Sequence, residues 1–335
     1  MNLQSSSAFP AITIDFAPIR NLVAYEMSAV DSLILEKLDS KVELITQIGN
    51  YITNNGGKRL RPLLLLLLAK ALGKFNQSHI VLATTIEFLH TASLLHDDVI
   101  DEATQRRGQK SANTVWGNAA SILAGDFLYA KAFQMLGSVN EKKATDLFAQ
   151  TCATLAEGEA LQLLNCHNPD INEACYLKVI SDKTAVLFRT AAHLAALASK
   201  ANPNQTEAVI NYADALGMAF QLVDDALDYS ANTDELGKNP GADLAEGKTT
   251  LPLIYAMQHA SAEQVQIIID AIKNGNREAF PKVHAVVIST HALDYTLQCA
   301  HEQAQLAITS LACLPDSIYK DALIDLANFS VLRRH

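Results

Sequence analysis

Apolar residues recur at helical spacing along most of the chain, and they do not alternate with polar residues over the length of a strand. This pattern predicts an all-α protein. The expected helices cover residues 21–38, 41–54 and 62–73, a long segment from residue 78 through an acidic cluster, and then residues 118–136, 141–165, 172–200 and 205–229, with shorter helices up to residue 333.

Capping residues and breakers support several of these boundaries. Pro62 stands at the start of a leucine-rich helix, where proline is favoured, and Ser78 and Asn172 are expected N-caps. Gly137 is the expected end of the 118–136 helix. Residues 230–250 contain several glycines and no periodicity, so we expect a loop there.

The chain contains no Pro- or Ser-rich linker and no shift in composition. We therefore expect a flexible tail over residues 1–20 and one helical domain over residues 21–335. Antiparallel helices in such a bundle can bring distant sequence motifs to one end of a central cavity.

The composition argues against several classes of protein. Apolar residues make up 49% of 335 residues, which is enough for a large core, while the net charge of −10 argues against nucleic-acid binding. Five cysteines without a C-x-x-C motif suggest neither a disulfide framework nor a zinc site. The N-terminus has no basic start or apolar run, and the leucine run is too short for a membrane span, so we expect a cytoplasmic location.

Three carboxylates end the long helix in the segment LLHDDVIDEATQRRG, residues 94–108: Asp97, Asp98 and Asp101. Asp97 and Asp101 are one helical turn apart, so they share a face and repel each other. A divalent cation would convert that repulsion into attraction.

The same spacing occurs again in QLVDDALD, residues 221–228, with Asp224, Asp225 and Asp228. One such motif is often a solvated acidic face. Two copies, both within apolar helices, indicate a site, because aspartate is rarely buried without a partner.

Basic residues gather near these motifs. Lys58 and Arg61 in GGKRLRP precede a helix N-terminus, where backbone N–H groups favour anions, and Arg106 with Arg107 suits phosphate contact. Three further lysines are candidates: Lys183, Lys238 and Lys248. Carboxylates opposite cations predict a diphosphate held through Mg²⁺, which binds few carboxylates together with phosphate oxygens.

The motifs GGKRLRP, LLHDDVIDEATQRRG, DKTA and QLVDDALDY…LGKNPGADLAEGKTTLP resemble those of the trans-polyprenyl diphosphate synthases, in the same order, from about residue 25 to the C-terminus. The resemblance is greatest to bacterial octaprenyl-forming members. It implies an all-α bundle around a deep central cavity and a homodimer. It also implies repeated condensation of isopentenyl diphosphate onto an allylic diphosphate, expected to be farnesyl diphosphate, to give a quinone side chain.

The resemblance also implies roles for individual residues. Mg²⁺, as two or three ions, would be held by Asp97, Asp101, Asp224 and Asp228, with Asp98, Asp225 and Lys183 completing the catalytic set. Isopentenyl diphosphate would be bound by Lys58, Arg61, His90 and Arg107. The allylic diphosphate would be bound by Arg106, Lys183, Thr184, Gln221, Lys238 and Lys248.

Product length should depend on the residues one turn below the first acidic motif. Ala92 and Ser93 are small there, whereas family members with short products tend to have an aromatic residue. Met135 is a candidate for a deeper floor of the cavity, although it is equally explained as a core methionine. Long apolar products would leave toward a membrane surface.

Three alternatives remain. A shorter-chain synthase or a terpene cyclase would share the helical cavity, and a cyclase would not need isopentenyl diphosphate. A non-catalytic partner subunit would typically lack one acidic motif. A di-iron bundle would need two E-x-x-H motifs, and we find only Glu87 with His90.

Overall fold

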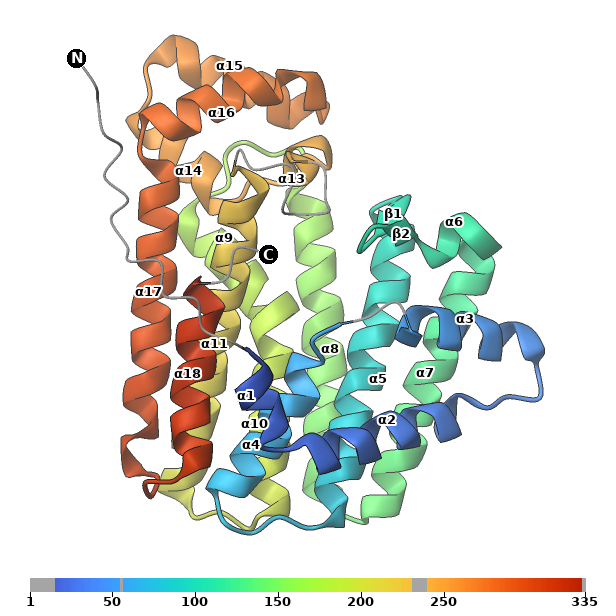
Figure 1. The fold of residues 1–335 in the computed structure, drawn as a ribbon. Helices are drawn as coiled ribbons and strands as arrows, with labels where there is room; N and C mark the ends of the chain where they lie inside the picture. Colours follow the sequence, from blue (N-terminus) through green and yellow to red (C-terminus); the bar gives the residue numbers. More distant parts are fainter. Residues whose placement is uncertain (1–15, 55–56, 231–239, 333–335) are drawn as a thin grey trace.

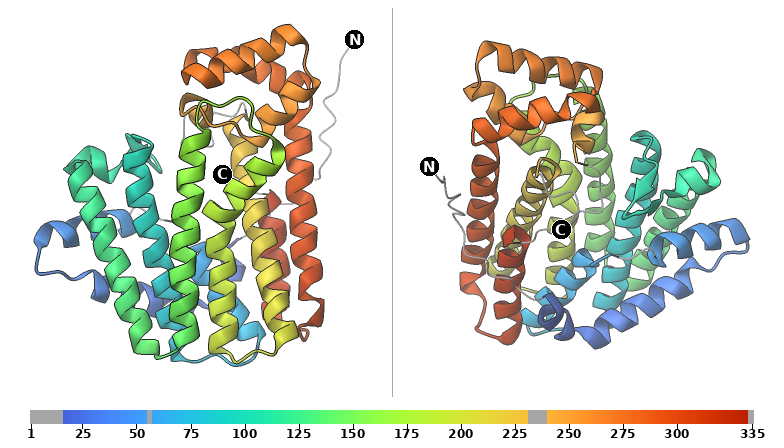
Figure 2. Two further views of the ribbon diagram at one scale, coloured as in Figure 1. Left: turned by 180° about the vertical axis from the view of Figure 1, so that it is seen from behind. Right: turned by 45° about the horizontal axis from the view of Figure 1, so that its top comes forward.

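The computed structural model describes residues 16–54, 57–230 and 240–332, and these are almost entirely helical (Figure 1). Long helices run roughly along one direction and form the body of the molecule. Two shorter helices, α15 and α16, lie across one end of it (Figure 2). The prediction of an all-α fold is confirmed.

The helices of the first half are α1 (Phe16–Asn21), α2 (Ala24–Leu38), α3 (Glu43–Asn54), α4 (Leu60–Ala71), α5 (Gln77–Ile100), α6 (Ala112–Trp116), α7 (Asn118–Val139) and α8 (Lys142–Asn165). The second half contains α9 (Glu173–Ile180), the π-helical turn η1 (Ser181–Ala185), α10 (Val186–Ala198), α11 (Pro203–Asp228), α13 (Ala242–Ala245), α14 (Leu251–His259), α15 (Ala262–Asn274), η2 (Arg277–Ala279), α16 (Phe280–Ser289), α17 (Ala292–Ser310), η3 (Leu311–Cys313) and α18 (Ile318–Leu332).

Three of the predicted helix boundaries are wrong. Pro62 does not start the leucine-rich helix, because α4 begins at Leu60 with Arg59 as its N-cap. The N-cap of α5 is Asn76, not Ser78, because the Asn76 side chain accepts the backbone N–H of Ser78 at 2.9 Å. Helix α7 passes through Gly137 and ends at Val139, where Asn140 takes a left-handed conformation with φ of 53°. The predicted cap Asn172 is confirmed, since its side chain accepts the N–H of Cys175 at 2.9 Å.

A small hairpin was not predicted. Strands β1 (Gln105–Arg106) and β2 (Gln109–Lys110) pair antiparallel around the two-residue turn Arg107–Gly108. Both turn residues have positive φ, 52° and 75°, which is the geometry that tight hairpins favour. Two-residue strands are too short to show an alternating pattern, and the four-residue helix α13 within the predicted loop is equally short.

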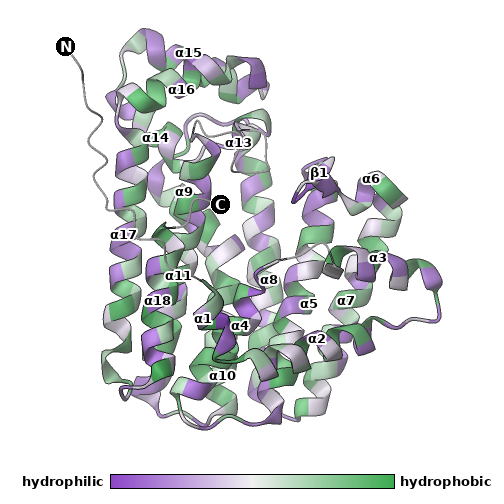
Figure 3. Ribbon diagram, in the orientation of Figure 1, coloured by the Kyte–Doolittle hydropathy of each residue, from purple (hydrophilic) through white to green (hydrophobic). Residues whose placement is uncertain are grey.

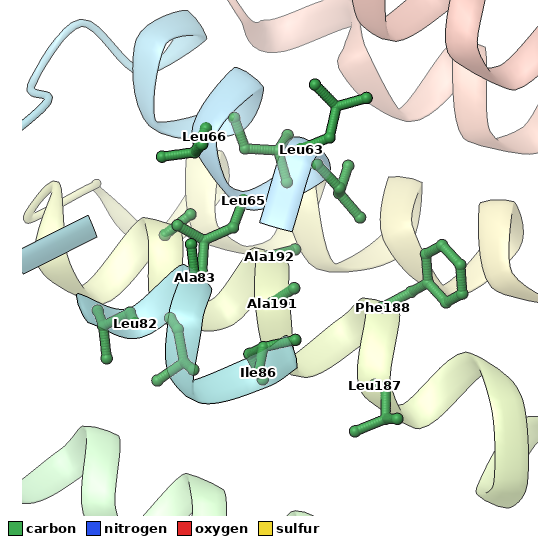
Figure 4. Close-up of a cluster of buried hydrophobic side chains, with 14 of the residues drawn as sticks. Leu63, Leu65, Leu66, Leu82, Ala83, Ile86, Leu187, Phe188, Ala191 and Ala192 are labelled. Atoms are coloured by element: carbon green, nitrogen blue, oxygen red, sulfur yellow. The ribbon is translucent and has the colours of Figure 1, made fainter. Parts of the chain in front are cut away.

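The core is centred on the leucine-rich helix α4, which packs between α5 and α10 (Figure 4). Leu63 to Leu68 are all fully buried, so this stretch of the helix is apolar on every side. Burying each leucine stabilises the fold by roughly 1.5–3 kcal/mol relative to exposure. Apolar and polar faces of the surrounding helices are seen in Figure 3. This packing fixes the N-terminal end of α4, and with it Arg61.

The N-terminal boundary differs from the predicted tail. Residues 16–20 belong to helix α1, whose Ile19 is buried, and residues 1–15 lie outside the described part of the chain. The assignment of residues 21–335 to one domain stays a prediction. In the described ranges, none of the helices has the length and apolar character needed to cross a membrane.

Candidate functional site

Two pockets flank the acidic motifs. The first encloses about 600 Å³ between the end of α3, helix α5 and the hairpin, and includes His90, Asp98, Arg106 and Arg107 in its lining. The second encloses about 690 Å³ among α8, α9, η1 and α11, and includes Lys183, Thr184, Gln221, Asp225 and Lys248. Both volumes include space that is open to solvent.

The first acidic motif lies at the C-terminal end of α5. Asp98 is buried, and its Oδ1 accepts two N–H groups of Arg106, from Nε at 2.8 Å and Nη2 at 2.7 Å. Asp101 is the C-cap of α5, and its Oδ2 accepts a hydrogen bond from Lys248 Nζ at 3.1 Å. The loop that follows the second motif therefore reaches the first.

Asp97 of the first acidic motif is also close enough to Lys183, which lines the second pocket, for the two charges to interact. Burial raises the pKa of the Asp97 carboxyl, Lys183 opposes this shift, and the carboxylate of Asp101 adds to it. Burial alone would lower the pKa of Lys248, but Asp101, Asp243 and Glu246 outweigh that effect and raise it. Lys248 is therefore a fixed cation beside Asp101 of the first acidic motif.

The second acidic motif is anchored by buried hydrogen bonds. Asp225 accepts from Tyr176 Oη at 2.6 Å and from Gln221 Nε2 at 2.6 Å, and burial raises its pKa well above the usual range. Asp228 accepts the backbone N–H groups of Ala242 and Asp243, both at 3.1 Å, so it orders the start of α13.

The third member of the second motif, Asp224, is half-buried, and its negative charge raises the pKa of Arg61. Burial lowers the pKa of Arg61 to about 10, against the opposing effects of Glu87 and Asp224. The Arg61 guanidinium also lies over the ring of Phe188, 4.7 Å from its centroid. Arg61 thus connects the first pocket with the second acidic motif.

His90 completes this link. Its Nε2 is 3.1 Å from Nη1 of Arg61. Burial lowers the pKa of His90 well below the ordinary histidine value, and Arg61 and Arg107 lower it further. The imidazole is therefore neutral at physiological pH, and its Nε2 accepts the hydrogen bond that Arg61 donates.

The guanidinium of Arg107 lies close to the backbone at Gly57. A Cβ atom on Gly57 would be 2.6 Å from Arg107 Nη1, so any larger residue at position 57 would require this guanidinium to move. Lys58 lies over the Phe329 ring, 5.0 Å from its centroid. Arg106 was expected in the allylic site, yet it lines the same pocket as Arg107.

Lys183 and Thr184 lie on the π-helical turn η1. Lys183 Nζ donates to Glu159 at 2.6 Å and to Gln162 at 2.5 Å, and Thr184 Oγ1 donates to Gln221 Oε1 at 2.9 Å. The prediction of one regular helix over residues 172–200 is therefore wrong, because η1 interrupts it.

Several candidate residues are not in the lining of these two pockets: Lys58, Arg61, Asp97, Asp101, Asp224 and Asp228 lie outside it. Ala92, Ser93 and Met135 are buried, but the described lining of either pocket does not include them. Lys238 lies outside the described residues. Within the described ranges no three His, Cys, Asp or Glu side chains converge as a ready metal cluster.

Sequence reasoning assigned no role to several residues that hold the site together. Arg59 pairs with Asp31 at 2.9 Å and with Glu87 at 3.5 Å, from a left-handed backbone conformation that begins α4. Glu159 holds Lys183, and Tyr176 holds Asp225. The sequence signals for them were the cation Arg59 within GGKRLRP and the Glu87-x-x-His90 spacing. In the structure Glu87 lies close to Arg59, and His90 lies close to Arg61.

An all-helical bundle with two acidic motifs, nearby cations and two flanking pockets is an arrangement suited to enzymes that bind diphosphates. Comparison with known proteins identifies the member of that class. Residues 42–287 match the model of the polyprenyl synthetase family, so the chain belongs to this family.

Similar proteins cover nearly the whole chain. The chain is 46% identical over 316 residues to octaprenyl diphosphate synthase of Escherichia coli, covering 94% of this chain and 98% of that one. It is 48% identical over 318 residues to octaprenyl diphosphate synthase of Haemophilus influenzae, covering 95% and 97%. Among solved structures, polyprenyl synthase from Caulobacter crescentus, complexed with calcium and isoprenyl diphosphate, has a TM-score of 0.93 and 38% identity, covering 97% and 100%. The predicted family is confirmed.

Proposed function

We propose that this protein is a trans-prenyltransferase that adds isopentenyl units repeatedly to an allylic diphosphate and releases octaprenyl diphosphate. Similarity to curated octaprenyl diphosphate synthases over nearly the full chain supports the product class. The observation that carries the proposal is the hydrogen bond from Lys248 to Asp101, because it brings a cation that lines the second pocket against the first acidic motif.

The arrangement of charges suits one diphosphate in each pocket. The first pocket presents Arg106, Arg107 and neutral His90, and we assign isopentenyl diphosphate to it. The second presents Lys183, Thr184 and Lys248, and we assign the allylic diphosphate to it. Cations that are already fixed by carboxylates need little rearrangement as charge develops on a departing diphosphate.

A divalent cation fits the residues between these pockets. The carboxylates of Asp97 and Asp101 repel each other, and this repulsion adds to the effect of burial in raising the pKa of Asp97. A cation shared between them would relieve this repulsion. Mg²⁺ typically uses one or two carboxylates together with phosphate oxygens, so Asp97 with Asp101, and Asp224 opposite, are the proposed ligands. When bound, Mg²⁺ stabilises the negative charge of the leaving diphosphate. Asp228 is a weaker candidate, because its two carboxylate oxygens accept backbone N–H groups.

We also propose a homodimer. Helix α7 exposes three large apolar side chains, Ile122, Leu123 and Phe133, at 41%, 61% and 41% of their surface. A second copy would remove this surface from water. Light scattering on the purified protein tests the assembly. A cytoplasmic location and release of product toward a membrane surface stay predictions.

One incubation tests the main proposal. The purified protein is mixed with farnesyl diphosphate, labelled isopentenyl diphosphate and Mg²⁺, and the products are sized by chromatography. Octaprenyl diphosphate is the expected result. Geranylgeranyl diphosphate would identify a shorter-chain synthase, and absence of any elongated product would favour the non-catalytic partner subunit.

A further inference from the structure

The π-helical turn η1 directs two consecutive side chains to opposite neighbours. Lys183 bonds to Glu159 and Gln162 on α8, whereas Thr184 bonds to Gln221 on α11. Both line the second pocket. A π-helical turn holds more residues than an α-helical turn and is correspondingly wider, and such turns are frequent at functional sites. The neighbouring helices must therefore leave room for it.

Both neighbouring helices have a glycine at the point of contact. A Cβ on Gly158 of α8 would lie 2.9 Å from Asp182 Cβ and 3.0 Å from the backbone nitrogen of Lys183. A Cβ on Gly217 of α11 would lie 2.7 Å from Ala185 Cα. Two of these three contacts are with backbone or Cα atoms, which cannot rotate away as the end of a side chain could. Either substitution would therefore displace the turn itself.

Other bonds hold the turn against these glycines. Lys178 Nζ donates to Asp182 Oδ2 at 2.5 Å, and Arg189 Nη1 donates to Ser181 Oγ at 2.9 Å. Both Gly158 and Gly217 are buried, and neither lines a pocket. Their effect on a ligand must therefore pass through the turn.

We propose that Gly158 and Gly217 are positioning residues that seat η1 between α8 and α11, and so place Lys183 and Thr184 against the allylic diphosphate. The inference rests on the proposed function, because it takes the second pocket as the allylic site. It assigns a role in substrate binding to two residues that cannot touch substrate.

Binding of farnesyl diphosphate with Mg²⁺, measured by titration calorimetry without isopentenyl diphosphate, tests this role. Gly158→Ala and Gly217→Ala should each raise the Kd about tenfold, which corresponds to loss of one charge-assisted hydrogen bond. The matched control is Gly137→Ala in α7, since a Cβ there would meet nothing within 4 Å. The control should leave the Kd unchanged.

A double variant separates positioning from general damage. In a Lys183→Met background, Gly158→Ala should raise the Kd by a smaller factor than in the wild type, because one of the two donors that it displaces is already gone. An undiminished effect in that background would overturn the proposal. So would unchanged affinity in both glycine variants.

Folding is followed by circular dichroism. If one variant does not fold, the other carries the test from the opposite side of the turn. Failure of both to fold would show that the glycines maintain the fold and would also overturn the proposal. A wild-type protein that binds farnesyl diphosphate as described but does not elongate it would refute the proposed function alone.

Discussion

Replacing His90 tests whether a neutral acceptor in the first pocket holds the Arg61 guanidinium behind it. His90→Gln keeps an acceptor oxygen for the Arg61 guanidinium, whereas His90→Leu removes it. The hydrogen bond is 3.1 Å long, its donor is charged, and both residues are half-buried. A hydrogen bond to a charged group contributes about 1.5–3 kcal/mol, and 1.4 kcal/mol corresponds to a factor of ten. We therefore expect the KM for isopentenyl diphosphate to rise roughly 10- to 100-fold in His90→Leu.

Steady-state kinetics with labelled isopentenyl diphosphate measures this effect. His90→Gln should keep the KM within about threefold of the wild type, since the acceptor is retained. The KM for the allylic diphosphate serves as the internal control and should stay constant in both variants. Equal losses in the two variants would refute the reasoning, because acceptor chemistry would then be irrelevant.

The pH dependence gives a second check on His90. Burial and the nearby arginines lower its pKa well below the ordinary value, so the imidazole should not titrate between about pH 6 and 8. The ratio of KM values for wild type and His90→Gln should then be constant across that range. A change in this ratio centred near the ordinary histidine pKa would show that His90 gains a proton there.

Three further predictions concern other parts of the chain. Asp97→Ala and Asp224→Ala should each lower turnover at saturating Mg²⁺ by at least about 100-fold, and near-normal rates in either would contradict the proposed site. Ala92→Phe should give shorter prenyl products with condensation intact, and unchanged product lengths on chromatography would exclude it as a determinant. His79 is buried with a lowered pKa, so its stabilising effect is present above the ordinary histidine pKa and is lost as the pH falls below it. The urea midpoint of unfolding should therefore fall more between pH 7 and 5 for the wild type than for His79→Gln. The glutamine retains the capping box but has no titrating ring. Equal falls in the two proteins would show that His79 does not cause the pH dependence.

Much of the site was visible in the sequence because it depends on features that are local in the chain. The i, i+4 spacing of Asp97 and Asp101 fixes them on one face of any helix that contains both, whatever surrounds it. The leucine run at 63–68 predicts a core helix in the same way. Such patterns need only the helical repeat.

The features that were missed depend on contacts between distant parts of the chain. Lys248 meets Asp101 across 147 residues, and Tyr176 meets Asp225 across 49 residues. Neither pair has a spacing that a sequence pattern could reveal. The hairpin at Arg107 was missed for another reason, because the turn and not the strands specifies it.

The π-helical turn combines both difficulties, and it shows where function departs from local preference. Residues 172–200 have the composition of an ordinary helix, so local propensity predicts an unbroken one. Glycines at 158 and 217, on two other helices, supply the space that the wider turn requires. A regular α-helix with the same residues would not be expected to present Lys183 and Thr184 to α8 and α11 in this way. The local irregularity is therefore decided by the packing of its neighbours, and the consequence is a pair of donors in the second pocket.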